Sequence, residues 1–375
     1  MTAALYSRSV TLMKLSAEAR NDKIRELLAG FIAQAKGTKS EISYPAPFLK
    51  EEVESLFTSH IWGHREITLT IILARLLDPS FQASKDFYAC NPRSIYEHPI
   101  RELLRKNGIP HKKSGPLNVA KNSQRIDETW AHNKRGDGMA LKVAGIVKKI
   151  ESVPPATLRK FAASYVRRYL LEAKKVAKLR LRIEKTEDPV FLNRLCRDLI
   201  QHVPDGGTTP QVVVGLLIKY MNDARGATVK ISGVSDSVST TNTTSKKPGD
   251  VIEEFPGSAP RVYEITVKKF SIDRMIESHE AIKAWDKKGE IAEVSVICRS
   301  KDVPEEADGS EAAPLLGVAK HEDVLYYFID IFVWIQAALL SMPPQGRKKF
   351  HEALIAHVNR INTSEKVKRY LSAWQ

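Results

Sequence analysis

A change of sequence texture near residue 204 constrains the fold of this chain more than any other feature. Before it, apolar residues recur with helical spacing between breakers, and after it short apolar runs typical of strands alternate with helical segments. The change coincides with the turn-forming run Pro-Asp-Gly-Gly-Thr-Thr-Pro at 204–210. We therefore predict an α+β protein with a helical N-terminal domain over residues 1–204 and a second domain over 205–375.

The first part contains helical patterns separated by breakers such as Asp78-Pro79 and Asn91-Pro92. The expected helices cover residues 16–35, 50–60, 65–77, 95–107 and 138–151. A longer helix is expected over residues 155–185, with an apolar stripe that includes Phe161, Tyr165 and Tyr169 and with Lys and Arg elsewhere. This part should be all-helical, and its last helix either lines a DNA groove or is a solvated connector.

The second part alternates between the two kinds of pattern. We expect a helix at 211–224, strands at 227–233, 250–255 and 261–268, a helix at 272–287 and a strand at 291–298. An apolar helix near 323–340 and an amphipathic helix near 345–361 should close the chain. The predicted core is therefore α-β-β-β-α-β, followed by C-terminal helices.

The positive charge of the chain is unevenly distributed. The net charge is +14, yet residues 206–375 carry 22 Lys+Arg against 22 Asp+Glu, whereas residues 1–205 carry 36 against 22. Residues 93–185 alone hold 23 basic and 8 acidic residues, an excess that attracts phosphate by counterion release. The candidate DNA-binding residues are Lys112, Lys113, Asn242, Lys246 and Lys247. A well-solvated helical surface is the alternative interpretation of the same excess.

The sequence also bears on the compartment. The N-terminus has no apolar run of signal-peptide length, and the longest apolar stretch, 326–340, is interrupted by Asp330 and Gln336. Three widely separated cysteines form no CxxC pair, which argues against a disulfide framework or a structural zinc site. We therefore expect a cytoplasmic protein with no membrane partner.

Two carboxylates follow one another on strands that a short connection should join as a hairpin. Asp250 begins one expected strand, and Glu264 lies in the next. Hard Mg²⁺ prefers such oxygen ligands, and the backbone carbonyl of Ile265 is a candidate third ligand. Side chains alternate along a strand, so Glu264, Thr266 and Lys268 should share one face. A charged, solvent-facing hairpin without a metal is the alternative.

The Gly249-Asp250 and Glu264 pair, within the α-β-β-β-α-β succession from about 210 to 298, resembles the PD-(D/E)xK nucleases and among them type II restriction endonucleases. The resemblance implies that Asp250 and Glu264 hold Mg²⁺ while a lysine orients or activates the attacking water. The chain departs from the motif in two places, because Gly249 separates Pro248 from Asp250 and Thr266 replaces the lysine.

The replacement at Thr266 leaves the catalytic cation to be found elsewhere. Lys268 is the first candidate and would have to reach back along the strand face, whereas Lys269 should face away. Lys246 or Lys247, in the loop before Asp250, is the alternative source of charge.

The expected function is that of a Mg²⁺-dependent, site-specific endonuclease acting on double-stranded DNA, in the manner of a type II site-specific deoxyribonuclease. We expect a homodimer, because two symmetric active sites are the simplest way to cut both strands. A non-catalytic DNA-binding protein and an RNA nuclease are the alternatives, since phosphate attraction distinguishes neither.

Overall fold

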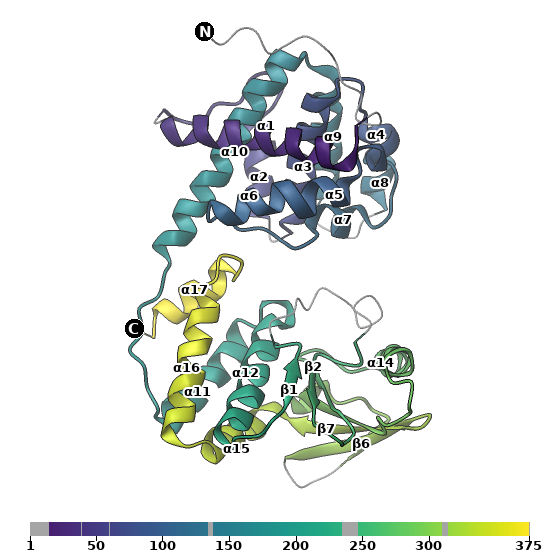
Figure 1. Cartoon of the computed structure of the whole chain (residues 1–375), viewed down its shortest axis with the longest axis vertical. Coiled ribbons are helices and arrows are strands. Elements are labelled where there is room, and N and C mark those ends of the chain that lie inside the picture. The colour runs from purple at the N-terminus through teal and green to yellow at the C-terminus, as the bar shows by residue number, and fades with distance from the viewer. Residues whose placement is uncertain are drawn as a thin grey trace. The chain divides into compact units, whose positions relative to one another are not determined.

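The computed structural model describes residues 15–38, 40–59, 61–133, 138–234, 247–309 and 314–374. The chain forms two compact units, Met1–Lys178 and Leu179–Gln375 (Figure 1). A helical region over residues 17–224 is followed by a mixed sheet of seven strands with interleaved and C-terminal helices, so the predicted α+β class is confirmed. Within the described ranges, no helix combines the length and apolar character that crossing a bilayer requires.

The boundary between the units falls after Lys178, earlier than the expected boundary at 204/205. Helix α11 (Pro189–His202) belongs to the second unit, because its apolar side chains pack in the core formed with α12 (Thr208–Ala224) and α15 (Ile331–Ser341). The turn-rich run at 204–210 therefore connects two packed helices within one unit. A turn signal marks a change of direction, and it does not reveal whether the flanking elements share a core.

The long basic helix is also shorter than expected. Helix α10 (Pro155–Lys178) ends at Lys178, and residues 179–188 continue as irregular chain instead of helix. The side chain of Asn359 fixes this segment, since its Oδ1 accepts from the Leu181 N–H at 2.8 Å and its Nδ2 donates to the Leu181 carbonyl at 3.0 Å. A distant side chain thus takes the hydrogen bonds that a helix would have formed.

The first unit is built around the buried helix α3 (Gly63–Leu77) and the apolar stripe of α10. Phe161, Tyr165 and Tyr169 are fully buried on this stripe, as their spacing predicts. The lysines and arginines of α10 lie on the other faces of the helix. The remaining helices of this unit are α1 (Ala17–Gly37), α2 (Lys50–Thr58), α4 (Ala83–Asp86), η2 (Phe87–Cys90), α5 (Pro92–Ile95), η3 (Tyr96–Ile100), α6 (Arg101–Lys106), α7 (Gly115–Ala120), α8 (Glu128–His132) and α9 (Met139–Ser152).

The second unit contains the sheet, in the order β1-β2-β3-β4-β7-β6-β5. Its strands are β1 (Lys230–Ser232), β2 (Val251–Glu254), β3 (Arg261–Ile265), β4 (Glu293–Cys298), β5 (Asp308–Gly309), β6 (Leu315–His321) and β7 (Val324–Asp330). The central strands β3, β4 and β7 run parallel to one another, and all other neighbouring pairs are antiparallel. The expected α-β-β-β-α-β order is present as α12, β1, β2, β3, α14 (Ile272–Trp285) and β4.

Helices cover both faces of this sheet (Figure 1). One face packs against α11, α12, α15 and α16 (Pro344–Val358), whereas the other packs against α14. Side chains alternate between the two cores along β4, where Val296 faces α14 and Ile297 faces the opposite side. The short helices η4 (Asp205–Gly207), η5 (Ser300–Asp302) and α17 (Glu365–Ser372) complete the unit.

The expected apolar helix near 323–340 is partly wrong, because its first half is strand β7. Residues 324–330 are rich in aromatic and branched side chains, and they pair with β4 on one side and β6 on the other. The helix begins only after Asp330, whose carboxylate caps it by accepting from the N–H groups of Phe332 and Val333 at 2.9 Å. A continuous apolar run does not by itself distinguish a buried strand from a buried helix.

Candidate functional site

Asp250 lies immediately before β2 and is fixed to the neighbouring strand β3 by two hydrogen bonds. Its backbone N–H donates to the Tyr263 carbonyl at 2.9 Å. Its side-chain Oδ2 accepts from the backbone N–H of Ile265, also at 2.9 Å. The hairpin therefore brings the Asp250 carboxylate to the end of β3, next to the residue that follows Glu264.

Two glycines next to Asp250, Gly249 and Gly233, are required at their positions for steric reasons. A Cβ on Gly249 would lie 2.6 Å from Val262 Cγ1 and 2.9 Å from the Tyr263 carbonyl oxygen. Gly233 has φ +94°, and a Cβ there would lie 1.9 Å from the Asp250 carbonyl oxygen. Only glycine allows so close an approach of backbone to backbone. Gly249, a departure from the nuclease motif, is thus required by the packing that positions Asp250.

Glu264 is a buried carboxylate in the middle of the sheet. It lies on β3 opposite Val296 of the parallel strand β4, and only 3% of its surface is exposed. Strand alternation places it on the same face as Val262, which packs in the core against α14. Its Oε2 lies 3.8 Å from Nη2 of Arg274 in the first turn of that helix.

Arg274 connects the parts of this site. Its Nη1 donates to Thr266 Oγ1 at 2.8 Å, and its guanidinium carbon lies 4.5 Å from the ring centroid of the buried Phe270. The side chain is 34% exposed, so part of the guanidinium faces solvent. Sequence reasoning missed this residue, although an arginine in the first turn of a helix that follows the motif strand is a usable signal.

Burial raises the pKa of the Asp250 carboxyl above its ordinary value. The hydrogen bond from the Ile265 N–H and the positive charge of Arg274 oppose this rise. An ionised carboxylate in such a place is costly unless a positive charge lies nearby. Arg274 supplies such a charge, since it acts on Asp250 and its Nη2 lies 3.8 Å from Glu264 Oε2.

The premise for Lys268 as the catalytic cation is wrong, because β3 ends at Ile265 and the strand alternation does not extend to residue 268. Thr266 turns the chain: its Oγ1 accepts from the Lys268 N–H at 3.1 Å and lies 3.0 Å from the Lys268 carbonyl oxygen. Lys268 is exposed on this bend. Lys269, expected to face away, forms an ion pair with Glu305.

The donor set of the site fits Mg²⁺. The ion usually takes one or two carboxylates and completes its octahedron with water and substrate phosphate. Asp250 and Glu264 would supply the carboxylates, and Ile265, the last residue of β3, the backbone carbonyl. Within the described part of the chain, no group of three or more His, Cys, Asp and Glu side chains is arranged to hold a metal.

A further buried carboxylate near the pair has a structural role. Glu253, on β2, accepts hydrogen bonds from the Asn222 side chain and from the Tyr263 hydroxyl, the latter at 2.6 Å. Asn222 belongs to α12, so Glu253 faces the opposite side of the sheet from α14. Its partners satisfy it without a metal.

The loop expected to contact DNA is described only in part. Asn242 and Lys246 lie outside the described residues, whereas Lys247 is described and partly buried before Pro248. Lys112 and Lys113 are exposed in the first unit. The Lys112 Nζ lies 5.1 Å from the Trp62 ring centroid, and the Lys113 carbonyl accepts from Arg101 at 3.1 Å.

The division into units sharpens the charge asymmetry. Residues 1–178 carry 31 Lys+Arg against 17 Asp+Glu, and residues 179–375 carry 27 against 27. The whole net charge of +14 therefore belongs to the first unit. A unit with this excess attracts a polyanion, while the unit with the carboxylate pair is neutral overall.

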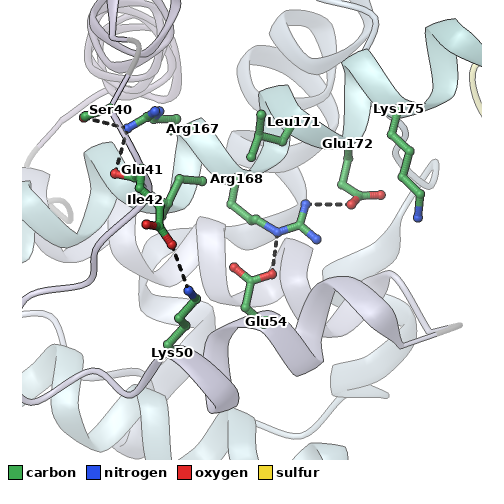
Figure 2. Close-up of a pocket in the computed structure, with 10 residues that line it drawn as sticks. All are labelled: Ser40, Glu41, Ile42, Lys50, Glu54, Arg167, Arg168, Leu171, Glu172 and Lys175. Carbon is green, nitrogen blue, oxygen red and sulfur yellow. Dashed lines mark hydrogen bonds and ion pairs between the residues drawn. The ribbon is translucent and has the colours of Figure 1, made fainter.

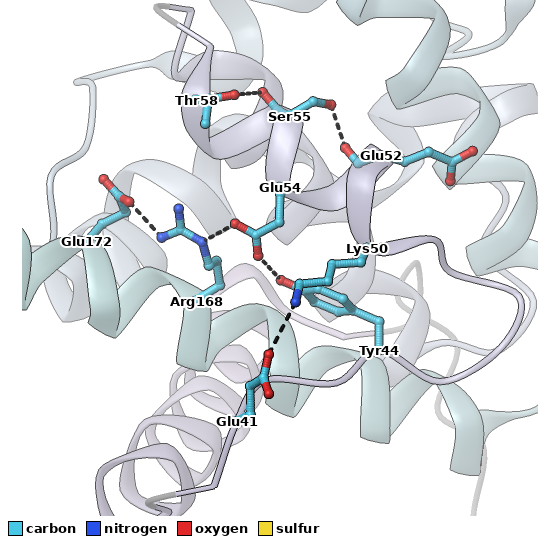
Figure 3. Close-up of polar contacts among 9 residues, drawn as sticks. All are labelled: Glu41, Tyr44, Lys50, Glu52, Glu54, Ser55, Thr58, Arg168 and Glu172. Atoms are coloured by element: carbon cyan, nitrogen blue, oxygen red, sulfur yellow. Dashed lines mark hydrogen bonds and ion pairs between the residues drawn. The ribbon is translucent and has the colours of Figure 1, made fainter.

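A surface pocket of about 620 Å³ in the first unit combines four cationic side chains with three carboxylates (Figure 2). Its cations are Lys50, Arg167, Arg168 and Lys175, and its anions are Glu41, Glu54 and Glu172. Arg168 lies between two of these carboxylates, 2.7 Å from Glu54 and 2.6 Å from Glu172 (Figure 3). The pocket is thus largely an ion-pair network that joins α10 to α2, and it is not a prepared phosphate site.

Arg168→Ala should destabilise the first unit by about 2–4 kcal/mol, because it leaves Glu54 and Glu172 without their shared cation. The Arg168 side chain is only 13% exposed and also lies 4.7 Å from the Phe57 ring centroid, so packing is lost as well. Urea unfolding followed by circular dichroism measures the change. Lys160→Ala, an exposed change on the same helix, should have little effect, and equal stability of the two variants would contradict this account.

Glu66 should make the first unit less stable as pH rises. Burial raises the pKa of its carboxyl from 4.5 to about 7, against the opposing charge of Arg65 and a hydrogen bond from the Lys112 N–H. Between pH 4.5 and 7 the folded state binds this proton more tightly than the unfolded state, so folding stability falls across that window and stays low above it.

Glu66→Gln should remove that pH dependence. The variant should match the wild type near pH 4.5 and exceed its unfolding free energy by roughly 3 kcal/mol at pH 8, because one pKa unit corresponds to 1.36 kcal/mol. Urea unfolding at the two pH values measures this. Glu51→Gln, at an exposed position on α2, is the control, and a difference between Glu66→Gln and wild type that does not change with pH would refute the prediction.

Comparison of the chain with protein-family models gives no match, and comparison with curated proteins gives none either. The case for a function therefore depends on the residues themselves. These are the paired carboxylates Asp250 and Glu264, the arginine that faces them, and the positive charge of the first unit.

Proposed function

We propose that this protein is a Mg²⁺-dependent endonuclease that hydrolyses phosphodiester bonds of double-stranded DNA. The observation that carries the proposal is the hydrogen bond from the Ile265 N–H to the Asp250 carboxylate, which brings Asp250 to the strand end next to Glu264. The charge of Arg274 acts on both carboxylates. A half-buried Asp250 and a buried Glu264 on paired strands are the kind of carboxylate ligands that Mg²⁺ takes in phosphoryl chemistry.

Each residue of the site has a distinct task in this proposal. Asp250 and Glu264 would hold Mg²⁺ together with the Ile265 carbonyl. The ion, when bound, polarises the scissile phosphate and lowers the pKa of the attacking water. The Ile265 N–H keeps the Asp250 carboxylate in one orientation, and burial of Glu264 keeps bulk water away from that carboxylate. Hydrolysis then adds water across the phosphodiester, as the bond from phosphorus to the leaving sugar oxygen breaks.

The first unit would hold the duplex. Its net charge of +14 supports binding to the phosphate backbone, and Lys112 and Lys113 are exposed there. We extend the proposal to Asn242, Lys246 and Lys247, in the sequence segment that precedes Asp250, as contacts to phosphate or bases. Phosphate contacts fix position, whereas base contacts would determine the sequence that is cut.

The resemblance to type II restriction endonucleases extends this proposal to site-specific cutting in the cytoplasm. A homodimer is part of it, because two symmetric centres cut both strands in one binding event. A non-catalytic DNA-binding protein would need the positive first unit but not an Asp250 carboxylate fixed by the N–H of the residue that follows Glu264. The carboxylate geometry therefore favours catalysis over binding alone.

The test uses the purified full-length protein and three substrates: double-stranded DNA, single-stranded DNA and RNA, each with Mg²⁺ or with EDTA. We expect Mg²⁺-dependent fragments of discrete size from double-stranded DNA. Preferential cutting of RNA would support the RNA nuclease instead. Binding of duplex DNA without cleavage of any substrate would identify a non-catalytic DNA-binding protein.

A further inference from the structure

Resting on the proposed nuclease function, we propose that Arg274 is the catalytic cation of the site and contacts the scissile phosphate in place of the motif lysine. The motif position is occupied by Thr266, which cannot supply a charge. The guanidinium of Arg274 donates to the hydroxyl of that same threonine at 2.8 Å. A helix residue thus reaches the position after β3 that the motif lysine would occupy.

The position of Arg274 relative to the carboxylates supports this role. Its Nη2 lies 3.8 Å from Glu264 Oε2, within ion-pair distance but longer than a hydrogen bond. Its charge also acts on Asp250. The guanidinium therefore lies within ion-pair distance of one proposed metal ligand, Glu264, and its charge acts on the other, Asp250.

The guanidinium is held in place without being fully enclosed. The ring of Phe270 lies beneath it at 4.5 Å, and Phe270 is itself fully buried, with its N–H bonded to the Asp302 carbonyl at 2.9 Å. Arg274 remains 34% exposed. A guanidinium has five N–H donors, so its contacts with Thr266 and Glu264 leave others for phosphate oxygens.

The chemistry of arginine specifies what this residue does. A guanidinium has five N–H donors and no acceptor atom, so Arg274 does not take a proton from the attacking water. It stabilises the negative charge that develops on the phosphate oxygens during hydrolysis. Lys268 lies exposed on the bend after β3, whereas Arg274 lies within ion-pair distance of Glu264.

The experiment compares single-turnover cleavage in Mg²⁺ with DNA affinity in Ca²⁺ for Arg274→Ala, Lys268→Ala and the control Lys283→Ala, an exposed cation on the same helix. Arg274→Ala should lose about 100- to 1000-fold in cleavage rate, as when an oxyanion donor is removed, with little change in affinity. Lys283→Ala should cleave as the wild type does. A merely structural role for Arg274 would lower thermal stability and affinity together with the rate.

Several outcomes overturn the inference. Near-normal cleavage by Arg274→Ala does so, and loss of cleavage in Lys268→Ala alone identifies the lysine as the cation. If Arg274→Ala fails to fold, Arg274→Gln decides, because glutamine keeps N–H donors but has no charge: a folded variant slowed about 100-fold or more supports the role of the cation, and a near-normal rate contradicts it. Absence of cleavage by the wild-type protein would overturn the proposed function itself. Failure of the proposed function can therefore be distinguished from failure of the inference about Arg274.

Discussion

Asp250→Asn and Glu264→Gln should each lose about a thousandfold or more in the rate of DNA cleavage, because each removes a carboxylate from the proposed metal site. Asparagine retains an oxygen that can accept from the Ile265 N–H, so the hairpin should keep its shape. Single-turnover cleavage of a plasmid in Mg²⁺ measures the loss. DNA affinity in EDTA should hold or rise, since a negative charge near the phosphate has been removed.

Glu254→Gln is the matched control for these two changes. Like Asp250 and Glu264, Glu254 carries a carboxylate. It lies on β2, is partly exposed and pairs with Lys230 of β1 at 2.8 Å. Its removal should leave the cleavage rate close to that of the wild type. Cleavage at a normal rate by Asp250→Asn or by Glu264→Gln would show that the carboxylate pair is not the catalytic centre.

The second large effect concerns salt. If the first unit contacts six to ten phosphates, the affinity for duplex DNA should fall about 10³- to 10⁵-fold between roughly 50 and 200 mM salt. The reason is that every neutralised phosphate releases condensed counterions, and the net charge of +14 lies in that unit. Fluorescence anisotropy of labelled duplex DNA, measured with the full-length protein in EDTA, gives the slope.

Lys112→Ala and Lys113→Ala locate this contact. Each should make the log–log slope less negative by about 0.9 if its ammonium group neutralises one phosphate. Lys219→Ala is the control, because Lys219 lies on α12 of the neutral second unit and pairs with Asp223 at 2.6 Å. A slope that is shallow in the wild type, or unchanged in both variants, would argue against these lysines as phosphate contacts.

The strand and helix order near the site could be predicted from sequence because its signals are local. Alternation and turn residues predict β2, β3 and α14, and the short connection predicts that Asp250 comes close to β3. These features depend on neighbours within a few residues, which the sequence displays directly.

The rest depends on contacts between distant segments. The end of α10 is determined by Asn359, far along the chain, and no local breaker in residues 179–185 announces it. Strand β7 resembles a helix in its apolar run and is a strand because β4 and β6 pair with it. Arg274 reaches Thr266 only because α14 packs on the face of β3 that carries Glu264.

The measurement that tests the central claim most directly is the single-turnover rate of plasmid cleavage by the wild-type protein as Mg²⁺ is titrated. We predict no cleavage in EDTA. As Mg²⁺ is added, the rate should rise to saturation, because the ion comes to occupy the site formed by the two carboxylates and the substrate phosphate. A protein that binds the plasmid yet leaves it intact at every Mg²⁺ concentration would contradict a nuclease centre at Asp250 and Glu264.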